Sequence, residues 1–178
     1  KFGVPYELLD VAGCVAVEPA LGHVREKIAG GLRLPGDETG DCFKFTNALA
    51  AVCHGQGVEF RWDTPIGAIE TDGRRITGIA TGAGRVQGDA YVVALGSYSP
   101  SLLAPIAVKV PVYPVKGYSI TVPITDPAGA PESTVMDETH KVAITRLGDR
   151  IRVGGTAELV GFDTTLRQGR RRTLEHVV

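Results

Sequence analysis

The chain has 178 residues, of which 43% are hydrophobic and 22% charged, and this composition fits a soluble globular protein with one core or with parts of two domains. Its 19 basic and 20 acidic residues give a net charge of −1, so no charge excess indicates nucleic acid or an anionic bilayer as a partner. The three cysteines are odd in number and lack Cys-x-x-Cys spacing, which predicts neither a disulfide framework nor a zinc site and favours a reducing compartment.

Helices and one short strand are predicted at the start of the chain. Pro5 suits the first turn of a helix, and a second short helix should end near Glu18, because Pro19 disfavours helix at the residue before it. Residues 28–34 then have the pattern of a short strand.

An amphipathic helix is predicted next, with Thr46 as its N-cap and Gly55 or Gly57 at its end. The prediction rests on apolar residues at helical spacing, namely Phe45, Ala48, Leu49, Val52 and Cys53. A strand at Val58–Arg61 would follow, and this alternation suggests half of a βαβ arrangement.

A β-meander is predicted after that strand. Residues 66–71 and 75–80 have strand patterns, and Asp72-Gly73 between them is typical of a two-residue type I′ turn. A third short strand is expected at residues 85–87.

The apolar run that follows is the centre of the predicted cofactor region. Residues 90–95 are continuously apolar, which is typical of a strand buried on both faces, and the run breaks at Gly96. Ligands of open α/β sheets bind at the carboxyl ends of such strands, and a glycine lets a ligand approach the backbone. Gly96 could equally do no more than end a core strand.

The second half is predicted to be mainly antiparallel sheet. After a short helix at residues 101–103, strands are expected in the second half of the segment 108–123 and at residues 133–136, 141–146 and 150–154, before a helix that is unfinished at residue 178. Lys116 and Tyr118 should share one sheet face, because alternate residues of a strand point the same way.

The sequence contains few motifs that indicate a catalytic or cofactor site. The sequence contains no Gly-x-Gly-x-x-Gly, no Walker motif and no Gly-x-Ser-x-Gly. The acidic loop at residues 37–41 lacks EF-hand spacing, and the four histidines are scattered, so we predict no metal site and no catalytic side chain.

Six runs that span nearly all of the chain carry a family resemblance: residues 4–10, 17–21, 30–42, 89–99, 112–119 and 150–155. They resemble the bacterial D-amino-acid dehydrogenase small-subunit family more closely than the related glycine, sarcosine and D-amino-acid oxidases. The run at residues 30–42 and the one around Val115-Lys116-Gly117-Tyr118 are the most specific.

The resemblance implies an FAD enzyme that oxidises D-amino acids to 2-oxo acids and ammonia, with hydride passing to the flavin and electrons to a quinone-type acceptor. It implies FAD contacts at five positions: Ile66, Ala94, Leu95, Gly96 and Tyr98. It also implies that Lys116, Tyr118 and His140 lie near the substrate, although relatives often carry a tyrosine in place of His140.

The family's diphosphate motif and its carboxylate-binding arginine fall outside these residues, so the chain resembles an internal fragment. We therefore expect an α+β fold: residues 1–44 as helices and a strand of a substrate domain, 45–99 as a βαβ-like slice of an FAD-binding, Rossmann-type domain with an inserted meander, and 100–178 as the substrate-binding antiparallel sheet and the start of a helix.

We expect the fragment alone to be inactive and its parent to be cytoplasmic, with at most peripheral attachment to the inner membrane. The resemblance allows a homo-oligomer. The alternatives are a related glycine or sarcosine oxidase and a non-catalytic interaction domain.

Overall fold

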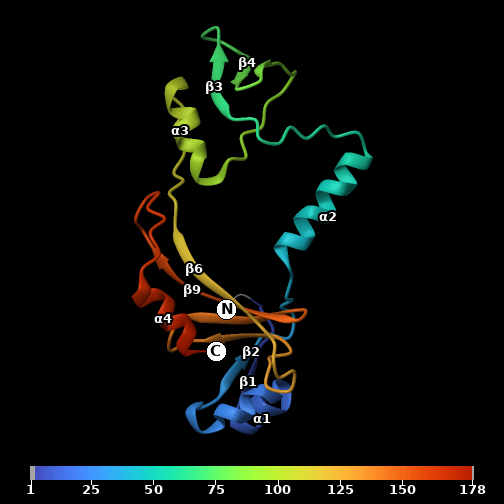
Figure 1. Cartoon of the computed structure of the whole chain (residues 1–178), viewed down its shortest axis with the longest axis vertical. Helices are drawn as coiled ribbons and strands as arrows, with labels where there is room; N and C mark the ends of the chain where they lie inside the picture. Colours follow the sequence, from blue (N-terminus) through green and yellow to red (C-terminus); the bar gives the residue numbers. More distant parts are fainter. Residues whose placement is uncertain (1–2, 178) are drawn as a thin grey trace. The chain divides into compact units, whose positions relative to one another are not determined.

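The computed structural model describes residues 3–177 and divides the chain into two compact units (Figure 1). The first unit combines residues 1–46 with residues 116–178, and the second unit holds residues 47–115. Lys1, Phe2 and Val178 lie outside the described residues. The assignment of the segments 1–44, 45–99 and 100–178 to substrate and cofactor domains stays a prediction.

The α-helices and strands of the first unit are β1 (Glu7–Leu9), α1 (Val11–Val17), β2 (Gly31–Arg33), the start of α2 (Cys42–Gly55), β6 (Lys116–Pro123), β7 (Thr134–Asp137), β8 (Val142–Leu147), β9 (Arg150–Glu158) and α4 (Gln168–His176). The second unit holds the rest of α2 with β3 (Ile66–Thr71), β4 (Ile76–Thr81), β5 (Gly84–Val86) and α3 (Ser99–Leu103). Short 3₁₀ helices lie at Pro19–Lys27, Gly96–Tyr98 and Ala104–Ile106.

A four-stranded antiparallel sheet, in the order β6-β9-β8-β7, is the centre of the first unit. Burial alternates along β6 and β7, and α4 covers one face of the sheet (Figure 1). The core lies where this helix meets the sheet and consists of Tyr118, Ile120, Val142, Ile144, Ile151, Val153, Leu174 and Val177. Leu174 is 1% exposed, so the burial of this side chain helps to hold α4 on the sheet.

All four strands of this sheet were predicted, but β9 continues to Glu158 instead of ending at Gly154. Thr156 has a φ of +68°, and the pairing of β6 with β9 shifts register between Lys116 and Tyr118. The irregularity is a β-bulge, which lets the strand continue beyond the glycine pair and brings Glu158 opposite Lys116.

The two glycines before the bulge have different surroundings. A Cβ atom on Gly155 would lie 2.8 Å from the backbone oxygen of Lys141 and 2.9 Å from Cγ2 of Val142. A Cβ on Gly154 would meet nothing closer than 3.9 Å. Gly155 is therefore required by the close approach of β8, and Gly154 is not.

The first residues depart from the prediction. Leu8 and Leu9 pair with Leu32 and Gly31 in a two-stranded sheet, so the helix expected at Pro5 is wrong. Helix α1 begins later because the side chain of Asp10 accepts a hydrogen bond from the Gly13 N–H at 2.8 Å and caps it. The expected helix end near Glu18 is confirmed.

Glu18 fixes this region to the loop before β7. Glu18 is 3% exposed, and its carboxylate accepts hydrogen bonds from the backbone N–H groups of Glu132 and Ser133 at 2.9–3.1 Å. The Ser133 hydroxyl donates a further bond at 2.8 Å. The buried charge is thus satisfied by donors rather than by a cation.

Helix α2 forms as predicted but begins earlier. The Lys44 N–H donates to Asp41 Oδ1 at 3.1 Å, so Asp41 lies at the start of the helix, and the predicted cap Thr46 instead donates to the Cys42 carbonyl inside it. In the sequence, Asp41 is the last residue of the acidic loop at residues 37–41, which hides its role as a helix cap. No residue of α2 is buried, so its apolar stripe forms no core among the described residues.

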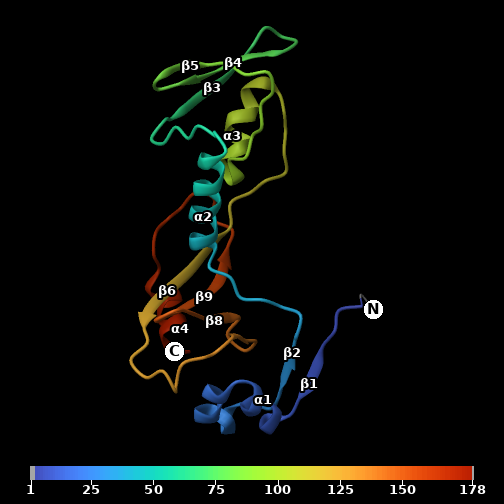
Figure 2. The same cartoon turned by 90° about the vertical axis from the view of Figure 1, so that its right-hand side faces the viewer.

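The second unit contains the predicted meander, a sheet of order β3-β4-β5, and α3 packs against β3 (Figure 2). The turn between β3 and β4 differs from the two-residue type I′ turn. Thr71 pairs with Ile76, and the Asp72 carboxylate accepts hydrogen bonds from the N–H groups of Arg74 and Arg75 at 2.8 Å. The side chain of Asp72 therefore closes a longer loop.

Two predicted strands are absent from the described part of the chain. Residues 58–61 and 90–95 lie outside every strand, and Val92 is 90% exposed. A strand needs a paired neighbour, and none of the described strands lies beside either segment. All pairings among residues 3–177 are antiparallel, so the α+β class is confirmed but the βαβ arrangement is not formed. In the described residues no helix has the length and hydropathy needed to cross a membrane.

We predict that Gly155→Ala lowers the free energy of unfolding of the chain by about 1–3 kcal/mol, because the added methyl group would overlap the backbone of β8. Gly154→Ala is the matched control and should change stability little. Urea unfolding followed by circular dichroism would measure both, and equal effects would contradict the proposed close approach.

Candidate functional site

The predicted substrate residues Lys116 and Tyr118 meet around the carboxylate of Glu158. The β-bulge brings Glu158, at the end of β9, opposite Lys116, at the start of β6. The Lys116 ammonium lies 3.3 Å from Glu158 Oε2, and the Tyr118 hydroxyl donates to the same oxygen at 3.0 Å. The predicted common orientation of Lys116 and Tyr118 is therefore confirmed.

Helix α4 and the loop before it complete this group. Arg170 Nε donates to Glu158 Oε1 at 2.9 Å, and Lys116 Nζ donates to the Thr165 carbonyl at 3.1 Å. Asp163 Oδ2 lies 3.8 Å from Lys116 Nζ and 3.7 Å from Arg167. We call Lys116, Tyr118, Glu158, Asp163 and Arg170 the Glu158 cluster.

The Glu158 cluster is largely shielded from water. The side chains of Glu158 and Lys116 are 6% and 12% exposed, whereas Arg170 is 51% exposed. The hydrogen bond from Arg170 is the main reason that the pKa of Glu158 lies below its ordinary value, and it outweighs the opposing effect of burial. Burial alone would lower the pKa of Lys116, but Tyr118 and Glu158 raise it above its ordinary value. Both groups are therefore charged at neutral pH.

His140, the third predicted substrate residue, is not part of the Glu158 cluster. His140 Nδ1 is 2.8 Å from Asp137 Oδ2, and its ring meets the ring of His176 edge-on at a centroid distance of 5.5 Å. The hydrogen bond from His140 is the main cause that holds the pKa of Asp137 below its ordinary value. The structure thus joins Lys116 to Tyr118 but places His140 in the turn between β7 and β8.

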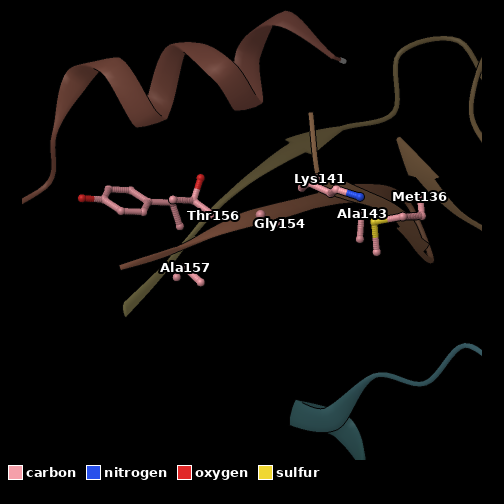
Figure 3. Close-up of a pocket in the computed structure, with 9 residues that line it drawn as sticks. Met136, Lys141, Ala143, Gly154, Thr156 and Ala157 are labelled. Carbon is pink, nitrogen blue, oxygen red and sulfur yellow. The ribbon is translucent and has the colours of Figure 1, made fainter. Parts of the chain in front are cut away.

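A hollow of about 600 Å³ lies on the sheet of the first unit. Figure 3 shows α4 along one side of the sheet, and the side chains of Met136 and Ala143 point away from this helix. Among the residues that line the hollow are Gly117, Met136, Lys141, Ala143, Gly154 and Thr156. Gly117 lies between Lys116 and Tyr118, so the Glu158 cluster fixes the backbone that forms one part of the hollow. No group of three or more potential ligands in residues 3–177 could hold a metal ion.

The five predicted FAD residues all lie in the second unit. Ile66 begins β3 and is 46% exposed. Gly96 has a φ of +53°, a left-handed conformation that favours glycine, and a Cβ there would meet nothing within 4 Å. The Tyr98 N–H donates to the Leu95 carbonyl at 3.1 Å, and Ala94 directly precedes this turn.

Sequence reasoning missed Glu158, Asp163 and Arg170. Arg170 belongs to a basic cluster whose pattern is typical of a solvated helix face, and nothing in the local pattern separates Glu158 from a surface glutamate. The register of β6 with β9 would have identified it, because this pairing places Glu158 opposite Lys116. That register depends on the bulge at Thr156, which the sequence does not predict.

Comparisons with known proteins agree on one family. The model of the family described as FAD dependent oxidoreductase matches residues 1–178. The D-amino acid dehydrogenase of Phenylobacterium zucineum is 64% identical over 98% of this chain, and that of Bradyrhizobium diazoefficiens is 63% identical over 99%. The chain spans only 41% and 42% of the length of these two relatives.

Solved structures of the same class have a similar fold. Glycine oxidase from Geobacillus kaustophilus superposes with a TM-score of 0.83 at 27% identity, covering 98% of this chain and 46% of that one. L-proline dehydrogenase from P. horikoshii also gives 0.83, over 98% of this chain and 47% of the other, but at 20% identity it supports the fold alone.

We predict that Glu158→Gln destabilises the chain at neutral pH and reduces its pH dependence. Because the folded-state pKa of Glu158 is lowered, its stabilisation is present above pH 4.5, its ordinary value, and is lost as the pH falls through the lowered pKa. The stability difference between wild type and variant should therefore be largest above pH 4.5 and shrink below it. Chemical unfolding across pH would measure it.

Glu175→Gln is the matched control, since Glu175 pairs with Arg171 on the exposed side of α4. It should change stability little at any pH. A stability difference for Glu158→Gln that stays constant across pH would contradict the charged state assigned to Glu158.

Proposed function

Because the chain belongs to the family of FAD-dependent oxidoreductases, we propose that it is part of a longer enzyme that oxidises D-amino acids to 2-oxo acids and ammonia. The observation that carries this proposal is the 64% identity to a D-amino acid dehydrogenase over 98% of the chain. The chain spans less than half of such relatives, so the activity is proposed for the longer polypeptide.

The segment from Ala94 to Tyr98, with Ile66, would hold part of the FAD. Support comes from Gly96, whose left-handed backbone and open surroundings leave room for a ligand against the main chain. When bound, FAD supplies the redox chemistry by accepting a hydride from the substrate. The chain's own residues would then bind and orient, and none of them needs to act as a base.

Lys116 and Tyr118 would contribute on the substrate side by holding the backbone of β6 in place. The Tyr118 hydroxyl carries one hydrogen, and its 3.0 Å bond to Glu158 is shorter than its 3.3 Å approach to the Thr165 carbonyl. The Lys116 ammonium is likewise held by Glu158 and Thr165. These contacts support a role in fixing Gly117 at the hollow, and His140 at the far turn remains a proposed substrate neighbour.

The electron acceptor is proposed to be a membrane quinone or an equivalent carrier, reached from the cytoplasmic face. This proposal rests on the family resemblance of the sequence and is supported by the naming of the relatives as dehydrogenases rather than oxidases. The enzyme would then work without using oxygen.

A second candidate is an amine oxidase that acts on glycine or sarcosine and reduces oxygen. The specific observation in its favour is the superposition on glycine oxidase from Geobacillus kaustophilus. The higher identity to D-amino acid dehydrogenases supports the first proposal over it.

We expect the full-length protein that contains this chain to reduce an artificial dye when D-alanine is supplied, and to do so more slowly with L-alanine, glycine or sarcosine. The measurement is dye reduction under nitrogen compared with oxygen consumption in air. Oxygen consumption driven by glycine or sarcosine would contradict the proposal and favour the amine oxidase.

We also expect this chain alone to bind FAD only weakly, because it contains no Gly-x-Gly-x-x-Gly motif for the diphosphate. Quenching of flavin fluorescence on titration with the chain would measure the affinity. Micromolar binding would show that the residues around Gly96 suffice by themselves.

A further inference from the structure

Glu18 is a buried carboxylate that the proposed chemistry does not use. It is 3% exposed and lies at the end of α1. Its two oxygens accept four hydrogen bonds from Glu132 and Ser133, which follow it by 114 and 115 positions in the sequence. A buried charge is costly unless hydrogen bonds satisfy it, so this contact fixes the loop at residues 132–133 firmly.

The loop that Glu18 holds continues directly into β7. This strand has four residues, Thr134–Asp137, and pairs with β8 at the edge of the sheet. So short an edge strand has few pairings of its own to hold it. Its other end is fixed by Asp137, whose Oδ1 accepts the N–H groups of Thr139 and His140 at 2.8 and 3.1 Å. A carboxylate therefore holds each end of β7.

Met136 is the side chain that β7 presents to the hollow on the sheet. It points away from α4, is 54% exposed, and pairs in register with Ala143 of β8 (Figure 3). Beside it the hollow is lined by small residues, among them Ala143, Gly154 and Ala157. A flexible thioether side chain adapts to its surroundings, so the place of its backbone decides how far it reaches over the hollow. The position of β7 therefore sets the width of the hollow at this edge.

We propose that Glu18 is a positioning residue for the reaction: by fixing the start of β7 it holds Met136 at the wall of the hollow, and Met136 there limits the size of the substrate side chain. This inference rests on the proposed function, since it takes the hollow as the place of that side chain. The described residues that line the hollow carry no carboxylate, and the Lys141 ammonium is paired with Glu138. The hollow therefore suits D-amino acids with small, uncharged side chains.

A purely structural role for Glu18 has a different signature. If Glu18 only stabilised the fold, its replacement would lower the amount of active enzyme and affect all substrates alike. A positioning role changes the ratio between large and small substrates, and this change depends on Met136. The coupling between the two residues therefore separates the two roles.

The test is a double-mutant cycle in the full-length protein that contains this chain, with kcat/KM measured for D-phenylalanine and D-alanine. Met136→Ala should raise the ratio of the first to the second on the order of 10-fold, because it removes the wall of the hollow. Glu18→Gln should raise this ratio too, since an amide has one acceptor oxygen where the carboxylate has two. In the Met136→Ala background, Glu18→Gln should add little to the ratio.

Glu132→Gln is the matched control, because it removes a charge from an exposed side chain of the same loop and leaves the backbone N–H in place. It should leave the ratio unchanged. Ser133→Ala removes one donor and should raise the ratio by a smaller factor, which provides a second variant if Glu18→Gln folds poorly. The proposal would be overturned if Glu18→Gln changed the ratio equally in both backgrounds or in neither.

A second measurement does not depend on the reaction. Met136 is the single methionine of this chain, so isotope labelling of the methionine methyl group gives one NMR resonance that reports on the hollow. We expect Glu18→Gln to shift or broaden this resonance and Glu132→Gln to leave it unchanged. An unaltered resonance in Glu18→Gln would overturn the proposal. If the full-length protein oxidised no D-amino acid, the proposed function would be refuted instead, and the resonance would still decide whether Glu18 positions Met136.

Discussion

The first unit depends on one buried carboxylate. Glu158 ends β9, and its two oxygens receive Lys116 and Tyr118 of β6 and Arg170 of α4. Because a buried charge is costly unless its partners are all present, these groups fix the end of the sheet, the loop through Thr165 and α4 relative to one another. The Leu174 side chain, which packs on the sheet, adds the burial of apolar surface that a charged group cannot provide.

This arrangement links stability to the proposed function. The Glu158 cluster holds the two residues on either side of Gly117, and Gly117 lines the hollow on the sheet. A change in the cluster should therefore be felt at the hollow without any direct contact between Lys116 and a substrate. In the proposed enzyme, β6 would act as a rigid element that positions the substrate side, while the flavin supplies the chemistry.

The second unit has much less internal support. Its buried residues are few, among them Ile69 and Ser99, and its longest apolar segment is unpaired. The meander and α3 fold on local pairing and contact, whereas several apolar side chains of Tyr91–Leu95 and α2 are exposed. The chain spans 41% of the length of one relative and 46% of a solved structure on which it superposes.

The sequence by itself determined the features that depend on local pattern: the positions of the antiparallel strands, the common face of Lys116 and Tyr118, the amphipathic pattern of α2, and the family resemblance. Two local predictions are wrong, the helix at Pro5 and the two-residue turn at Asp72-Gly73. The side chain of Asp10 caps a helix that begins later, and the side chain of Asp72 closes a longer loop. Only the tertiary structure decided the register of β6 with β9, and with it the site of Glu158, because a bulge at Thr156 shifts that register. It also decided that residues 90–95 form no strand within this chain, since a strand is defined by the neighbour with which it pairs.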